Sequence, residues 1–251
     1  MPGNQNIIVL GMHRSGTSLI ASILYKIGFF MGEELLGKNI SNPLGHFEDQ
    51  NLIDLNDQIL SAAGGTWYDP PERGAILNQS GKFQQEIVSS VAAMPSGLWG
   101  WKDPRLCLTI ELFLPYLDTP VFIICRREPS SIAESLYRRN RIDYKQGLSV
   151  VDIYQKRIDL FLEKYPDHRR MIIRYEEICS NPDQAVRQII DFLKLEIQPK
   201  IFREAVKSVV SRTRIHRMER RIERNDLIKT AFFQFFKNPK VFFIKLKNYL
   251  T

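Results

Sequence analysis

The chain has 251 residues, 44% of them hydrophobic and 25% charged, which is the balance of an ordinary soluble globular protein with one sizeable core. Three widely spaced cysteines with no C-x-x-C pair argue against a disulfide framework or a zinc site and fit a reducing cytoplasm, and no segment approaches the roughly 20 apolar residues of a membrane-spanning helix. The net charge of +7 comes from the C-terminal end, because residues 200–251 hold 14 Lys and Arg against 4 Asp and Glu.

Short apolar runs alternate with amphipathic stretches along most of the chain. In chain order this predicts strand 6–10, helix 15–28, loop 32–47, helix 48–63, loop 64–74, helix 80–94, strand 98–102, helix 108–117, strand 120–125, helix 128–141, helix 150–165, strand 170–175 and helix 181–195. Such alternation indicates an α/β fold, here a P-loop NTPase-like three-layer sandwich with a central, mainly parallel sheet flanked by helices. We expect one domain, residues 1–210, followed by a basic, aromatic-rich helical extension, residues 211–251.

Residues 11–18, "GMHRSGTS", have the two glycines of the phosphate-binding P-loop pattern G-x-x-x-x-G-K-[ST], but Thr17 takes the place of its lysine. A glycine-rich turn between a strand and a helix presents backbone N–H groups and the positive end of the helix dipole to an anion. Arg14 lies inside the loop, where a guanidinium can bind two phosphate or sulfate oxygens, and Thr17 and Ser18 add hydroxyl donors. Anion binding is the favoured interpretation, and a plain glycine-rich turn is the alternative.

The acids of a Mg²⁺ site are missing from the expected positions. An ATPase or kinase of this fold usually needs the P-loop lysine and a Walker-B aspartate, whereas the strand at 120–125 runs into Arg126 and Arg127. A site built from arginines favours an anionic donor that is handled without a metal, and we expect no metal ion.

Three stretches follow one another in a set order: "HRSGTS" at 13–18, "REPSSIAES" at 127–135 and "RYEEICSNP" at 174–182. They resemble three motifs of sulfotransferases that use 3′-phosphoadenosine 5′-phosphosulfate (PAPS): the phosphosulfate-binding loop, the R-x-P-x-x-x-x-x-S motif that holds the 3′-phosphate, and the segment whose tyrosine contacts the adenine. The resemblance spans about residues 7–207 and implies a PAPS-dependent sulfotransferase that releases 3′-phosphoadenosine 5′-phosphate (PAP). The donor-binding residues that it implies are His13, Arg14, Ser15, Gly16, Thr17, Ser18, Arg127, Ser135 and Tyr175.

The resemblance also implies cations at the reacting centre. Arg14 is one of them, at the basic position of the loop in both the cytosolic and the tyrosylprotein enzymes. Lys102 in "WGWKDPR" is the other, because this stretch resembles the K-D-P segment of the tyrosylprotein enzymes, whose lysine contacts the sulfate. A surface lysine that closes a strand is the alternative interpretation of Lys102.

The general base is not where the cytosolic enzymes have it. Their K-T-H segment supplies a histidine, and aligning the lysines puts Pro104 in that place. Glu48, at the start of a predicted helix, is the first candidate, with His46 and Glu34 as alternatives. An ordinary acid in the first turn of a helix is the competing interpretation of Glu48.

The C-terminal end departs from the family pattern, because the R-K-G motif that completes the 3′-phosphate site of the cytosolic enzymes is missing. "SRTRIHRMERR" offers Arg212 or Arg214 as substitutes, or is only a charged helix. Beyond it, "AFFQFFKNPKVFFIKLKNYL" interleaves aromatic residues with lysines, as an interfacial membrane anchor does; packing on the domain or in a homo-oligomer is the alternative. We therefore expect a cytoplasmic protein that is peripheral to a membrane or self-associates, with no nucleic-acid partner.

The acceptor is expected to be a saccharide or glycolipid hydroxyl. The loops at 32–47 and 64–74, with Trp67 and Tyr68, are candidates for an aromatic-lined acceptor cleft. An atypical P-loop small-molecule kinase and a non-catalytic nucleotide-binding protein are the alternatives to a sulfotransferase.

Overall fold

The computed structural model describes residues 5–36 and 45–210, and the chain divides into two units, Met1–Val209 and Val210–Thr251, of which the first is described below. Its strands are β1 (Gln5–Leu10), β2 (Leu98–Lys102), β3 (Val121–Arg126) and β4 (Arg170–Arg174). Its helices are α1 (Thr17–Lys26), α2 (Gln50–Ala62), α3 (Arg73–Leu77), α4 (Ser80–Ala92), α5 (Leu106–Phe113), α6 (Pro129–Asn140), α7 (Tyr144–Lys164), α8 (Tyr175–Ser180) and α9 (Pro182–Leu193). A 3₁₀ turn, η1 (Leu114–Tyr116), follows α5, and residues 199–209 are also helical.

The four strands form one parallel sheet in the order β2-β1-β3-β4. β1 lies between β2 and β3, so that Ile7 pairs with Gly100 on one side and with Val121 on the other. The chain leaves β1 towards β2 and later crosses to β3 on the opposite side, and at such a switch point a crevice opens at the carboxyl ends of the strands. The P-loop, which follows β1, begins at this crevice.

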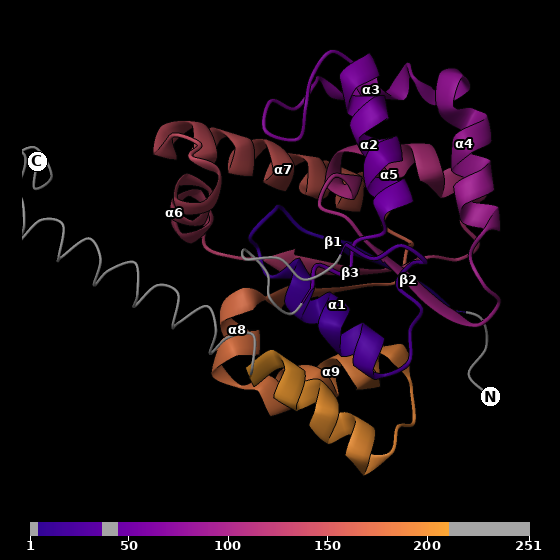
Figure 1. The fold of residues 1–251 in the computed structure, drawn as a ribbon, viewed down its shortest axis with the longest axis vertical. Helices are drawn as coiled ribbons and strands as arrows, with labels where there is room; N and C mark the ends of the chain where they lie inside the picture. Colours follow the sequence, from indigo (N-terminus) through magenta and orange to yellow (C-terminus); the bar gives the residue numbers. More distant parts are fainter. Residues whose placement is uncertain (1–4, 37–44, 211–251) are drawn as a thin grey trace, which may run out of the picture. The chain divides into compact units, whose positions relative to one another are not determined.

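Alternate residues of β1 belong to two different cores. Ile8 and Leu10 pack in a core with α2 to α7, whereas Ile7 and Val9 pack in a core with α1, α8 and α9. Figure 1 shows these two layers of helices on opposite sides of the sheet. Because both faces are covered, the inner strands are apolar on both sides, as parallel strands usually are. The expected three-layer α/β fold is confirmed.

β4 is an outer strand, and within the described residues its only strand partner is β3. Its residues alternate in exposure: Ile173 is buried on the α9 side, whereas Arg170, Ile172 and Arg174 are exposed. Ile172 is 53% exposed, an unusual position for an isoleucine in a strand.

Each strand and helix expected between residues 6 and 195 is present, and in this range the structure adds two short helices. α3 begins inside the loop expected at 64–74, and α8 follows β4 where no separate helix was predicted. Helices of five or six residues are not stable by themselves, and these two are anchored by Ile76 and Ile178, both fully buried. α7 begins at Tyr144, six residues before the expected start, because Asp143 caps its first turn.

Several expectations concern residues outside the described ranges. The extension 211–251, with Arg212 and Arg214, and residues 37–44 of the first loop belong to this group. The domain boundary after residue 210, the membrane contact and the homo-oligomer therefore stay predictions. Within residues 5–36 and 45–210, no helix combines the length and the apolar character that crossing a bilayer requires.

Candidate active site

The P-loop turns from β1 into α1 through three residues with positive φ, Gly11, Arg14 and Gly16. Arg14 has a φ of 68° and Gly16 a φ of 104°, in the left-handed region that glycine adopts without strain. Glycine is needed at position 16 for a second reason, because a Cβ there would lie 2.5 Å from Cδ2 of Tyr175. The Tyr175 ring, at the start of α8, therefore packs directly against the P-loop.

Two buried thiols anchor the loop. The Gly11 N–H donates to Sγ of Cys107 at 3.1 Å, and Sγ of Cys125 donates to the carbonyl of Ser15 at 3.1 Å. Burial raises the pKa of both thiols to about 12, so they stay protonated at neutral pH. They act as structural anchors and not as nucleophiles. The side chains of Ser15 and Thr17 are also buried beneath the loop.

The predicted donor-binding residues meet at the P-loop. Nε of Arg14 donates to Oγ of Ser135 in α6 at 2.8 Å. Arg127, directly after β3, donates to the Arg14 carbonyl at 2.7 Å, and its guanidinium lies 4.2 Å from the centre of the Tyr175 ring. We call Arg14, Arg127, Ser135 and Tyr175 the donor cluster. It unites three motifs that are up to 161 positions apart in the sequence, from Arg14 to Tyr175.

A second group, the reaction cluster, consists of Ser18, Glu48 and Lys102. Nζ of Lys102, at the end of β2, donates to Oγ of Ser18 at 3.1 Å and forms a short ion pair with Oε1 of Glu48. It also donates to the carbonyl of His46 at 3.3 Å. Lys102 is only 2% exposed, so the surface-lysine interpretation is wrong.

Backbone contacts on both sides of Glu48 fix its position. The Leu36 N–H donates to the Glu48 carbonyl at 2.8 Å, and the His46 N–H donates to the Leu36 carbonyl at 3.3 Å. Asp49, the next residue, caps α2 and also accepts from the N–H of Glu33 at 2.8 Å. Glu48 therefore sits on a short antiparallel pairing that ends at the start of α2, and it lies before the helix and not in its first turn.

The two alternative bases occupy different places. His46 is buried, and its carbonyl contacts Lys102. Glu34 is exposed, and its carbonyl accepts from the Gln50 N–H at 2.9 Å. Of the three candidates, Glu48 is the one whose carboxylate contacts Lys102.

His13, in the P-loop, belongs to a row of aromatic rings. Its ring centre lies 4.3 Å from that of Trp67, and Tyr68 meets Trp67 edge-on at 5.3 Å. Burial, and then the nearby cations led by Arg105 and Lys102, hold the pKa of His13 well below its usual value. His13 is therefore neutral, and within the described residues its buried Nε2 has no hydrogen-bond partner.

Sequence reasoning missed a buried polar network beside Lys102. Asp103 accepts from Nδ2 of Asn56 at 2.8 Å, and from both the N–H and Nη1 of Arg105 at 3.0 Å. Nε of Arg105 also donates to Asp57 at 2.5 Å, and Thr109 donates to Oδ1 of Asn56 at 2.7 Å. The one local sign of this network in the sequence is that an acidic residue, Asp103, directly follows Lys102 at the end of a strand.

Opposite effects act on the charges in this network. Burial raises the pKa of Asp103, and the Arg105 charge opposes that shift. Burial also disfavours the charge of Arg105, but Asp103 and Asp57 outweigh it and raise the Arg105 pKa. Among the described residues, the hydrogen-bond partners of the Asp103 carboxylate are all N–H donors, which fits the carboxylate form.

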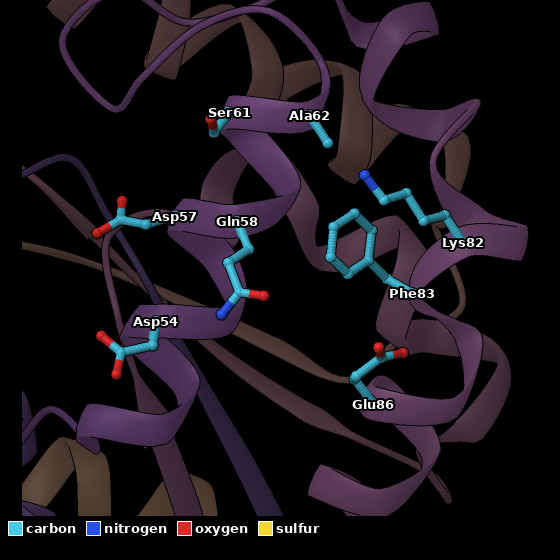
Figure 2. Close-up of a pocket in the computed structure, with 8 residues that line it drawn as sticks. All are labelled: Asp54, Asp57, Gln58, Ser61, Ala62, Lys82, Phe83 and Glu86. Carbon is cyan, nitrogen blue, oxygen red and sulfur yellow. The ribbon is translucent and has the colours of Figure 1, made fainter.

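A cleft of about 710 Å³ lies between α2 and α4 (Figure 2). Its lining is Asp54, Asp57, Gln58, Ser61, Ala62, Lys82, Phe83 and Glu86. None of the donor-cluster or reaction-cluster residues lines it, and it differs from the acceptor cleft expected between the loops 32–47 and 64–74. Within the described residues no group of three His, Cys, Asp or Glu side chains is arranged to hold a metal, and the absence of a metal stays a prediction.

Several solved sulfotransferase structures are similar to this chain. The sulfotransferase domain of the Synechococcus PCC 7002 olefin synthase is 19% identical, with a TM-score of 0.50 over 82% of this chain and 77% of that one. The Alicyclobacillus acidocaldarius sulfotransferase is 14% identical, with a TM-score of 0.47 over 83% of this chain and 95% of that one. A mouse sulfotransferase complexed with PAP is 12% identical, with a TM-score of 0.46 over 82% of this chain and 63% of that one.

The likeness to the Synechococcus domain, at a TM-score of 0.50 and 19% identity, shows the fold alone. No protein of curated function matches the sequence. A profile of the sulfotransferase family, however, matches residues 6–199, which is most of the chain. The resemblance found in the three sequence motifs is thereby confirmed, and the chain belongs to the sulfotransferase family.

Proposed function

We propose that this enzyme transfers a sulfuryl group from PAPS to an acceptor hydroxyl and releases PAP. The donor cluster carries the proposal, because it gathers two guanidinium groups, a hydroxyl and an aromatic ring at a P-loop. Guanidinium groups bind phosphate and sulfate oxygens in pairs, and an aromatic ring offers a face to the adenine. We assign the 3′-phosphate to Arg127 and Ser135, the phosphosulfate to Arg14 and the P-loop N–H groups, and the adenine to Tyr175.

The reaction cluster supplies the groups for the transfer. The acceptor oxygen attacks sulfur while its proton passes to the carboxylate of Glu48, and the bond between sulfur and the bridging oxygen breaks. The electron pair of that bond stays on the 5′-phosphate of PAP, whose new negative charge Lys102 and Arg14 stabilise. The ion pair between Lys102 and Glu48 supports this assignment, because it brings a cation and a carboxylate together beside the P-loop.

We propose a saccharide or glycolipid hydroxyl as the acceptor. The row His13, Trp67 and Tyr68 leads from the P-loop outwards, and Tyr68 is 43% exposed. Flat aromatic faces beside a reacting centre suit a ring-shaped acceptor that is apolar on one face and carries hydroxyls at its edge. This part of the proposal is independent of the donor assignment and is tested separately.

Ligand stabilisation tests the donor. We expect PAP to stabilise the folded chain without Mg²⁺, by about 2.7 kcal/mol when PAP is about 100-fold above its Kd. ATP should stabilise it less, with or without Mg²⁺. Stabilisation by ATP that depends on Mg²⁺ would instead indicate an atypical P-loop kinase.

Transfer of labelled sulfate tests the acceptor. The probes are octyl β-glucoside, chitotriose, 4-nitrophenol and a tyrosine peptide, each incubated with PAPS and with wild type or a Glu48→Gln variant. We expect product with the saccharide probes and wild type. Product with only the phenolic probes would contradict the acceptor proposal, and PAP binding without any transfer would indicate a non-catalytic nucleotide-binding protein.

A further inference from the structure

The network of Asp103, Asn56 and Arg105 joins three elements at one point. Asp103 follows the last residue of β2, Asn56 lies in α2, and Arg105 directly precedes α5. Asp103 and Asn56 are completely buried. Thr109, in α5, donates to Oδ1 of Asn56 and so orients the amide with its Nδ2 towards Asp103. Both carboxylate oxygens of Asp103 and both polar atoms of the Asn56 amide have a partner within this set, so the contact fits one relative position of α2, β2 and α5.

The relative position of α2 and β2 matters because Lys102 and Glu48 of the reaction cluster lie at the ends of these two elements. Lys102 is the residue before Asp103, and Glu48 lies just before the start of α2, about two helical turns from Asn56. The distance from Nζ of Lys102 to the Glu48 carboxylate therefore depends on how α2 sits against the end of β2. An apolar contact would allow α2 to shift slightly against β2. The hydrogen bond from the Asn56 amide to the Asp103 carboxylate instead favours a single relative position of the two elements.

We propose that Asp103, through Asn56 and Arg105, is a positioning residue that keeps the base Glu48 and the cation Lys102 at their working distance. The inference rests on the proposed function. Asp57, also in α2, holds Arg105 in place by accepting a hydrogen bond from its Nε, and so adds a second link between α2 and the start of α5. The donor cluster lies on the β1, β3 and β4 side and shares no residue with the network.

Asp103→Asn removes the charge and keeps the shape. We expect its kcat for the best probe of the acceptor panel to fall about 10- to 100-fold, because small misplacements of reacting groups have effects of this size. The KM for PAPS and the Kd for PAP should stay within about twofold of wild type. A crystal structure of the variant with PAP should show that the contact between Lys102 and Glu48 is lost or lengthened.

Glu111→Gln is the matched control. Glu111 also ties elements together, since it accepts from Arg73 at 2.6 and 2.7 Å and from Lys164 at 3.0 Å, but these join α3, α5 and α7. This variant should lose stability and keep wild-type kcat. An equal loss of kcat in both variants would show a merely structural role and overturn the inference. An Asp103→Asn protein with wild-type kcat and an intact Lys102–Glu48 contact would do the same.

Asp57→Ala covers the case in which Asp103→Asn does not fold, because Asp57 is half-exposed and easier to replace. We expect a smaller fall of kcat, with an unchanged Kd for PAP. Unchanged kcat in a folded Asp57→Ala protein would then overturn the inference. Failure of the proposed function is seen separately, as a wild-type chain that PAP does not stabilise.

Discussion

The donor cluster and the reaction cluster lie on opposite sides of the P-loop and are built differently. Arg14, Arg127 and Tyr175 each belong to a short motif, and they meet because β1, β3 and β4 end at the same edge of the sheet. Glu48 belongs to no motif, and it reaches Lys102 only through the pairing of residues 34–36 with the segment before α2. The members of the donor cluster are thus recognisable from local motifs, whereas Glu48 is singled out only by a tertiary contact.

The largest effect that separates the two clusters is expected from Glu48→Gln. Glutamine keeps the shape and can still accept from Lys102, but it cannot take the acceptor's proton. Transfer should fall about 10²- to 10⁴-fold, the usual contribution of a general base. The stabilisation by PAP should persist, because the donor cluster is untouched.

His46→Asn and Glu34→Gln are the controls for that variant, and both should transfer sulfate at rates near wild type. Full activity of Glu48→Gln, with loss of activity in either control, would move the role of base to the other residue. Loss of PAP binding in Glu48→Gln would mean that the two clusters are not separable.

The reverse effect is expected from Arg127→Ala, which acts on the donor cluster. The variant removes the contacts with the Arg14 carbonyl and with the Tyr175 ring. The Kd for PAP should rise about 10- to 100-fold, because a hydrogen bond to a charged group contributes about 1.5–3 kcal/mol. Arg126→Ala is the matched control, since Arg126 pairs with Asp159 and should leave the Kd unchanged.

A smaller effect on the donor side is expected from Gly16→Ala. The new methyl group would lie 2.5 Å from Cδ2 of Tyr175, in addition to the strain of a φ of 104°. Such backbone strain costs about 1–3 kcal/mol of stability. Displacement of the ring should weaken PAP binding as well. Gly28→Ala separates the two causes, because Gly28 has the same φ with no atom within 4 Å of the new Cβ, so only stability should fall.

The smallest effect on either cluster is expected from Glu111→Gln, which should change only stability and its pH dependence. Burial would raise the pKa of Glu111, but the hydrogen bonds from Arg73, Lys164 and Tyr165 outweigh burial and lower this pKa to about 2. A carboxylate with a lowered folded-state pKa stabilises the fold above its ordinary pKa of 4.5 and loses this contribution as the pH falls through about 2.

Urea unfolding of wild type and Glu111→Gln should therefore differ by about 1–3 kcal/mol at pH 7, and by progressively less between pH 4.5 and 2. A difference that stays constant down to pH 2 would show that the carboxylate charge is not the cause.

Much of the fold was predictable because the sheet is covered on both faces. The inner strands β1 and β3 contain uninterrupted apolar runs, and most of the helices are long enough to show their own periodicity. α3 and α8 were not predicted, because they consist of five and six residues and depend on buried Ile76 and Ile178. Their stability comes from contacts with distant segments, which local patterns do not contain.

In the candidate site, the residues that belong to motifs were predictable, whereas most of the contacts between them were not. Arg127 and Ser135 were found by motif, but their meeting with Arg14 needed the strand order. Asp103 was missed because nothing near it in the sequence indicates that Asn56, 47 positions earlier, would satisfy its carboxylate. The contact of His13 with Trp67 was missed for the same reason, since the loop 64–74 carries no pattern that predicts its path.

The outer strand β4 bears on how copies of this chain meet. Strand edges invite pairing with other chains, and proteins protect them with charged side chains. If two copies paired antiparallel about Ile172, Arg170 of each would face Arg174 of the other, and like charges directly opposite one another are destabilising. The two arginines thus disfavour sheet extension about Ile172 in this antiparallel register.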